Sequence, residues 1–168
     1  MYMLYEFDDT KEAVINPSNI IDRVENIPEV AIACFSRDLF EKIVEGGKCL
    51  PIAEISNTNG KKTIYELEYR DKKIALFMIG VGAPVAAGDL EDIHAMGVNK
   101  FVVFGNCGVL DKSIDDCSVI IPTEAIRDEG ISYHYAKASD TIKVNKKYVP
   151  EFKEILSEFG YSDTEGMS

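Results

Sequence analysis

Two short glycine-containing segments hold the residues best placed to contact a small ligand. Gly80-Val-Gly-Ala-Pro84 follows one apolar run, and Gly105-Asn-Cys-Gly108 follows another. Glycine lets the backbone approach a ligand closely, and a helix that begins at such a turn presents free N–H groups. The pattern predicts a ligand site at the carboxyl ends of parallel strands. A tight strand-to-helix turn without a ligand would produce the same local pattern.

Polar residues within and after these segments suggest further contacts. Asn106 can donate a hydrogen bond, whereas Cys107 is a weak donor. The sequence shows no feature that would activate the Cys107 thiol, so a nucleophilic role is disfavoured. The charged segment from Arg127 to His134 has two interpretations: a hydrogen-bonded network beside a site, or an exposed polar loop.

Alternating strands and helices are expected to position these residues. The apolar run 30–35 predicts a buried strand, and Ser36 can cap a helix that begins at Arg37 and stops at Gly46-Gly47. We further expect a short helix through residues 17–24, a hairpin of strands 63–69 and 73–79, a helix over 84–96, strands over 101–104 and 117–121, and a helix over 146–159. Residues 57–62 are expected to form a turn and residues 122–126 to leave the sheet. The order predicts one α/β domain with a mixed sheet over residues 1–168.

Composition limits the classes of partner. The net charge is −11, which disfavours nucleic acid and anionic membranes because those partners need clustered Lys and Arg. No apolar run approaches the roughly 20 residues of a membrane-spanning helix, and the N-terminus is acidic where a signal peptide would be basic. We therefore expect a cytoplasmic protein. The four cysteines lack CxxC spacing and only two histidines occur, so no metal site is expected. Cys34 and Cys117 are expected to be buried apolar residues.

The glycine segments, with Val119-Ile-Ile-Pro122 and Arg127-Asp-Glu-Gly-Ile-Ser-Tyr-His-Tyr135, resemble the nucleoside phosphorylase family. This class includes uridine phosphorylase, purine nucleoside phosphorylase and related nucleosidases. The resemblance implies a three-layer α/β fold with a central mixed β-sheet and a homo-oligomer ranging from dimer to hexamer. It also implies a nucleoside or base as ligand, with no cofactor other than phosphate as a possible co-substrate.

The resemblance assigns binding residues but no catalytic residue. Phosphate-binding positions are Arg37, offset from the family's loop, and Asn106. Substrate-binding positions are Gly80, Gly82, Asn106, Cys107, Gly108 and Arg127. His94 and His134 are not expected to act in catalysis.

Several family contacts are replaced. The family's phosphate-binding arginines fall at Val103 and Leu39, and the glycine of the same loop falls at Phe35. A histidine that reaches a neighbouring subunit falls at Val14. Because an apolar side chain cannot replace a bidentate Arg–phosphate contact, classical phosphorolysis is not expected from these positions. At the glycine turn, Val85 stands where the family has Ser, and Met78 where it has a small or hydroxyl residue.

The sequence ends soon after the expected helix over 146–159. Two interpretations remain: a frayed tail, or a fold that is C-terminally incomplete relative to the family, which we favour. The function expected from the resemblance is cleavage of the N-glycosidic bond of a purine or pyrimidine nucleoside in salvage, with phosphate or water. The alternatives are a degenerate nucleoside-binding module and an incomplete fragment.

Overall fold

The computed structural model describes residues 6–114 and 119–168, so the expectations for Cys117 and the start of its strand lie outside the described residues. The described chain forms two compact units: residues 10–107, and residues 108–168 with the N-terminal segment through Asp9. That the chain acts as a single domain stays a prediction.

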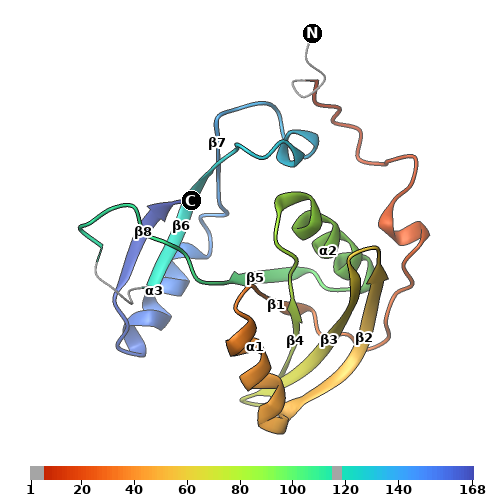
Figure 1. Cartoon of the computed structure of the whole chain (residues 1–168), viewed down its shortest axis with the longest axis horizontal. Coiled ribbons are helices and arrows are strands. Elements are labelled where there is room, and N and C mark those ends of the chain that lie inside the picture. The colour runs from red at the N-terminus through yellow and green to blue at the C-terminus, as the bar shows by residue number, and fades with distance from the viewer. Residues whose placement is uncertain (1–5, 115–118) are drawn as a thin grey trace. The chain divides into compact units, whose positions relative to one another are not determined.

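The larger unit is built on a mixed five-stranded sheet in the order β2-β3-β4-β1-β5 (Figure 1). β1 runs parallel to both β4 and β5, while β3 is antiparallel to β2 and to β4. The predicted mixed sheet is confirmed. The strands are β1 (Val30–Cys34), β2 (Cys49–Asn57), β3 (Gly60–Tyr69), β4 (Lys72–Met78) and β5 (Lys100–Phe104).

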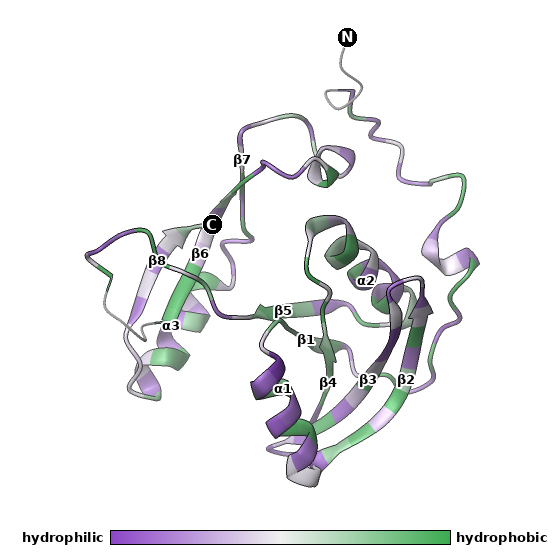
Figure 2. Ribbon diagram, viewed as in Figure 1, coloured by the Kyte–Doolittle hydropathy of each residue, from purple (hydrophilic) through white to green (hydrophobic). Residues whose placement is uncertain are grey.

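Two helices connect the parallel strands. α1 (Arg37–Ile43) lies between β1 and the hairpin, and α2 (Ala83–Met96) lies between β4 and β5. The two crossovers run in opposite directions across the sheet, so right-handed connections place the helices on opposite faces. Figure 2 shows β1 and β5 as largely hydrophobic. β1 contributes Ala31 and Ala33 to the buried core, whereas β5 is an edge strand whose Phe101 packs partly buried against that core. The buried core includes Ala31, Ala33, Ile55, Ile64, Ala75, Phe77, Ile79, Ile93, Met96 and Val98.

Several expectations for the larger unit are corrected. The helix through residues 17–24 is a single 3-10 turn, η2 (Pro17–Asn19), and Ser36 makes no side-chain cap on α1. Residues 49–57 form the additional strand β2, and β3 begins at Gly60, so most of the expected turn over 57–62 is strand. α1 continues into a π-helical turn, η3 (Val44–Lys48), where Gly47 has a φ of 77°.

The smaller unit contains a three-stranded sheet in the order β7-β6-β8. Its elements are β6 (Val119–Ile126), η4 (Ile131–His134), β7 (Thr141–Lys143), α3 (Val149–Glu158) and β8 (Asp163–Met167). The expectation that residues 122–126 leave the sheet was wrong, and the frayed-tail interpretation of the last residues does not hold. β6 continues through Pro122 with a register shift, and residues after α3 form a strand parallel to β6. A β-bulge tolerates proline because the ladder is locally interrupted there.

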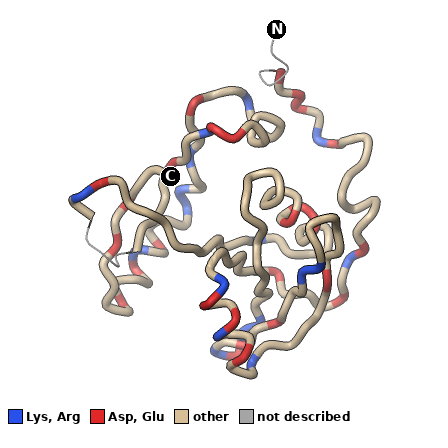
Figure 3. The backbone as a smooth tube through the Cα atoms, viewed as in Figure 1, with Lys and Arg blue, Asp and Glu red and all other residues tan. Residues whose placement is uncertain are grey.

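Charge is mixed along α1, where two acidic residues lie between two basic ones (Figure 3). Arg37 forms an exposed i,i+4 pair with Glu41 at 3.7 Å. Among the helices that the structure describes, none combines the length and the apolar character needed to cross a bilayer.

Candidate functional site

The carboxyl ends of β1, β4 and β5 lie side by side, as the sequence predicts. Cys34 is in register with Met78 on one side and with Phe104 on the other. Beyond the strands, the Phe35 N–H donates to the Phe104 carbonyl at 2.8 Å, and the Ile79 N–H donates to the Cys34 carbonyl at 3.1 Å. The two glycine segments therefore begin at the same edge of one sheet.

The first glycine segment depends on the absence of side chains. Gly82 precedes α2 with a φ of 102°, a conformation that glycine adopts readily. Gly80 has no room for a side chain: a Cβ there would overlap Val85 Cγ1, lie 2.9 Å from Lys62 Nζ and lie 3.1 Å from Asp89 Oδ2. The turn leaves its tip open, with Val81 87% exposed. The residue at the tip of the turn is therefore exposed, while the start of the turn at Gly80 is closely packed.

A buried ion pair, which the sequence did not predict, packs against this turn at Gly80. Asp89 is only 2% exposed, and its Oδ2 accepts hydrogen bonds from Lys62 Nζ and, at 2.8 Å, from the Gly80 N–H. Asp89, Ile93 and Met96 form the buried face of α2. A carboxylate at this helical spacing among apolar residues was the signal available in the sequence.

The second glycine segment is exposed. A Cβ on Gly105 would lie 2.9 Å from Phe35 Cβ, so this glycine allows close packing between the ends of β1 and β5. Asn106 and Cys107 follow it and are exposed to solvent. Their side chains are accessible to a ligand.

Apolar side chains occupy this edge of the sheet. Val103 is 54% exposed, Phe104 44% and Phe35 38%, and Leu39 at the start of α1 is 37% exposed. Exposed apolar groups at the ends of these strands favour a neutral, partly apolar ligand over an anion. Arg37 is mostly exposed and paired with Glu41, and its predicted phosphate contact stays a prediction.

Arg127 lies in the smaller unit, where it organises its own loop. It is 4% exposed and stacks 4.4 Å from the ring centre of Tyr133. All five of its N–H groups donate within the loop: Nε to Ser132 Oγ, Nη1 to Lys137 O and Ser139 Oγ, and Nη2 to Ser132 O and Ala136 O. The network interpretation of this segment fits these contacts, and the exposed-loop interpretation does not fit Arg127. Ligand contact by Gly108 and Arg127 stays a prediction.

The two histidines lie outside the two glycine segments. His134 is exposed at the end of η4. His94 Nδ1 lies 2.7 Å from the Val98 carbonyl, where it joins the end of α2 to the chain that enters β5. In the described ranges, no group of three or more His, Cys, Asp or Glu residues is arranged to hold a metal ion.

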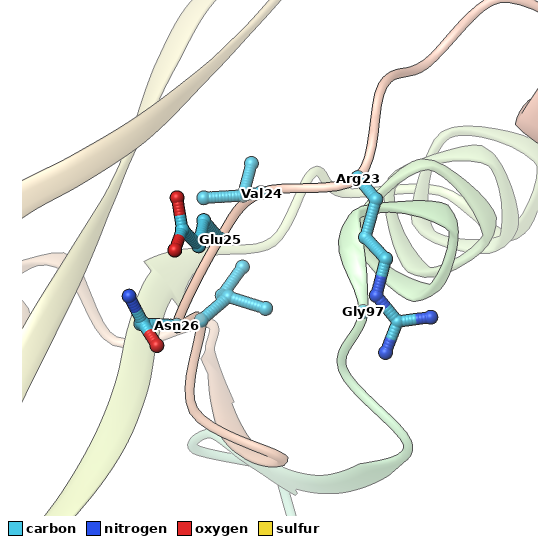
Figure 4. A pocket seen from close by; sticks show the side chains of 6 residues that line it. Arg23, Val24, Glu25, Asn26 and Gly97 are labelled. Carbon is cyan, nitrogen blue, oxygen red and sulfur yellow. The ribbon is translucent and has the colours of Figure 1, made fainter.

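Two surface hollows lie at the opposite end of α2. One of about 470 Å³ is lined by residues 23–27 and Gly97, with the Arg23 side chain beside Gly97 (Figure 4). The other, of about 520 Å³, includes Lys11 and Glu91. Neither includes residues of the glycine segments, so neither coincides with the candidate site.

Sequence comparisons agree with this geometry. A profile of the phosphorylase superfamily matches residues 29–167. The chain belongs to this superfamily. Its relatives include a guanosine phosphorylase of Halorubrum lacusprofundi, 28% identical over 83 residues, and a uridine phosphorylase of Thermococcus kodakarensis, 26% identical over 115 residues. These matches cover 49% and 63% of the chain, but only 34% and 42% of the relatives.

Two solved structures have a similar fold. Uridine phosphorylase from Vibrio fischeri ES114 matches 88% of the chain and 60% of its own length, with a TM-score of 0.73 and 21% identity. MTAN from Helicobacter pylori matches 82% of the chain and 64% of its own length, with a TM-score of 0.62 and 20% identity. These likenesses confirm the predicted nucleoside-phosphorylase-like α/β fold. The chain spans less than half the length of the two sequence relatives above.

Asp92, one turn beyond Asp89 on α2, supplies a pH-dependent prediction. Burial, together with the charges of Asp89 and Glu91, raises the pKa of Asp92 above 3.8. The unfolded chain then releases this proton at lower pH than the folded chain, so stability falls as pH rises from about 3.8 through the folded pKa. Asp92→Asn should therefore raise the thermal unfolding temperature at pH 7 and lose this advantage at acidic pH. Equal pH profiles for the variant and the wild type would contradict the assignment.

Proposed function

We propose that this chain binds a nucleoside at the carboxyl ends of β1, β4 and β5 and takes part in cleavage of its N-glycosidic bond. The observation that carries the proposal is the paired glycine segments at one sheet edge, with Gly80 and Gly82 opening α2. Membership in the phosphorylase superfamily supports the ligand class. A cytoplasmic location and homo-oligomeric assembly belong to the same proposal.

The reaction makes limited demands on the protein's side chains. The bond between the ribose C1′ and a base nitrogen breaks, and the base leaves with the electron pair and takes up a proton. An oxygen of phosphate or water bonds to C1′. The ribose becomes cation-like as the bond breaks, so the site would act chiefly by holding the sugar and by stabilising the developing charges. Asn106 is the exposed polar side chain at this edge that suits such contacts.

The apolar residues at the strand ends affect whether phosphate or water would act as the nucleophile. Val103 and Leu39 stand where the resemblance expects arginines, and both are partly exposed beside the site. A dianionic co-substrate would find no guanidinium at these two positions. This observation favours a second candidate function, which is nucleoside binding without phosphorolysis, and within the enzyme proposal it favours water over phosphate.

Base release from nucleosides tests these possibilities directly. We would incubate the full chain with a panel of purine and pyrimidine nucleosides, with and without phosphate, and quantify the free base by chromatography. We expect release to be independent of phosphate. Release that requires phosphate would establish a phosphorylase and show that other groups replace the arginines. Binding without release would leave the binding module, and absence of both from a folded sample would contradict the proposed function.

A further inference from the structure

We propose that Lys62 and Asp89 form a positioning pair that holds the glycine turn of the ligand site and thereby sets its affinity for a nucleoside. The affinity part of this inference rests on the proposed function. The positioning part rests on geometry within the larger unit alone.

The pair joins three separate elements at one point. Lys62 comes from β3, Asp89 from the second turn of α2, and Gly80 from the segment that follows β4. Asp89 Oδ2 accepts both the Lys62 ammonium and the Gly80 N–H. The path of the backbone at Gly80 is therefore fixed by a carboxylate on the helix that the turn itself begins.

The packing around Gly80 leaves little freedom for another arrangement. Lys62 Nζ and Asp89 Oδ2 lie 2.9 Å and 3.1 Å from the place of a Cβ, so both charged groups pack directly against the glycine. Their side chains are 16% and 1% exposed. Because the surroundings are poor in water, a hydrogen bond from the Gly80 N–H to an ionised carboxylate is stronger than one to a neutral group.

Stability alone does not account for this arrangement. Replacing a buried ion pair by apolar side chains of similar size is often neutral or stabilising, whereas removing one partner is strongly destabilising. An apolar pair could fill the same space but could not accept the Gly80 N–H. The ion pair thus differs from an apolar pair in one respect: it accepts a hydrogen bond from the Gly80 N–H and so fixes the turn.

The pair also affects which ligand the turn can accept. The ammonium of Lys62 is adjacent to the turn, but the Asp89 carboxylate neutralises it. The base of the turn is therefore electrically balanced. This balance agrees with the apolar side chains at the neighbouring strand ends, because both favour a neutral nucleoside over phosphate.

The first test compares Asp89→Asn and Lys62→Met with Lys61→Met in the full chain. Lys61 is a suitable control because it is the residue before Lys62 on β3 and its ion pair is on the surface. Its Nζ lies 2.9 Å from Oε1 of Glu54. The readouts are the Gly80 amide resonance without ligand and the dissociation constants for uridine and guanosine. We expect Asp89→Asn and Lys62→Met to shift the resonance and to weaken binding about tenfold, the equivalent of losing one charge-assisted hydrogen bond. Lys61→Met should change neither readout.

A double variant separates positioning from folding. In Lys62→Met/Asp89→Leu, unfolding free energy should recover toward the wild-type value, since no buried charge remains unpaired. Nucleoside affinity should remain about tenfold weakened, because the Gly80 N–H still lacks its acceptor. Recovery of affinity together with stability would overturn the inference. If Asp89→Asn does not fold, the double variant still tests the inference.

The outcomes distinguish this inference from the proposed function. A wild-type chain that binds neither nucleoside would overturn the proposed function and, with it, the affinity part of the inference. The Gly80 resonance would still test positioning in that case. A resonance that Asp89→Asn leaves unmoved would overturn the positioning part whatever the chain binds.

Discussion

Gly80→Ala should destabilise the larger unit by about 1–3 kcal/mol, the usual cost of forcing a group into a packed site. The new methyl group would overlap Val85 Cγ1 and press against Lys62 and Asp89. Val85 cannot readily turn away, because its β-branched side chain has few rotamers in a helix. Urea unfolding of the variant and the wild type, followed by tyrosine fluorescence, would measure the loss. Nucleoside binding should fall with it.

Gly88→Ala is the matched control for this experiment. Gly88 lies on the same helix, and a Cβ there would meet no heavy atom within 4 Å. Alanine in a helix interior is favoured over glycine by about 0.5–1 kcal/mol, so this variant should be slightly more stable than the wild type. Equal effects from the two substitutions would show that the Gly80 turn is less tightly packed than described.

Arg127→Met should destabilise the smaller unit by about 3 kcal/mol or more, because the loop would lose at once all the hydrogen bonds that this buried guanidinium donates. The side chain now supplies hydrogen bonds to five oxygen atoms of its loop. Arg127→Lys should restore little of the loss, since an ammonium cannot reproduce the planar arrangement of donors. Hydrogen exchange of the amides over 119–143 would measure the effect within this unit.

Arg37→Met provides the comparison for Arg127. Arg37 is exposed and its contact with Glu41 is a surface i,i+4 pair at 3.7 Å. Such pairs contribute about 0.3–0.5 kcal/mol. A loss at Arg37 as large as that at Arg127 would contradict the view that the buried network carries the stability. A loss at Arg127 below about 1 kcal/mol would show that water replaces its hydrogen bonds.

The parts of the fold that could be predicted from the sequence are those with strong local patterns. The apolar runs of β1 and β5 and the Pro-to-Gly limits of α2 were sufficient to place both glycine segments at one sheet edge. Lys62 was missed because residues 57–62 are rich in Asn, Gly and Lys, which are depleted in strands. Pairing with β2 nevertheless makes these residues strand from Gly60 onward.

The errors in the smaller unit have a similar cause. Pro122 suggested the end of a strand, but the sheet accommodates it at a register shift. Residues 163–167, with their polar composition, have little intrinsic strand preference and become β8 through pairing with β6. At the chain end, Ser168 exchanges backbone hydrogen bonds with Glu124 and Ile126. Such long-range pairing is not encoded in any local window.

The length of the two-residue turn between β3 and β4 determines the face of the sheet on which Lys62 lies. Arg70 and Asp71 both have positive φ, as a tight hairpin turn requires, and they fix Tyr69 opposite Lys72. Adding or removing one residue there would slip β3 along β4 and turn Lys62 to the opposite face of the sheet. Descendants of this sequence should therefore tolerate substitutions in this turn far better than insertions or deletions, although the turn lies at the opposite end of β3 from Lys62.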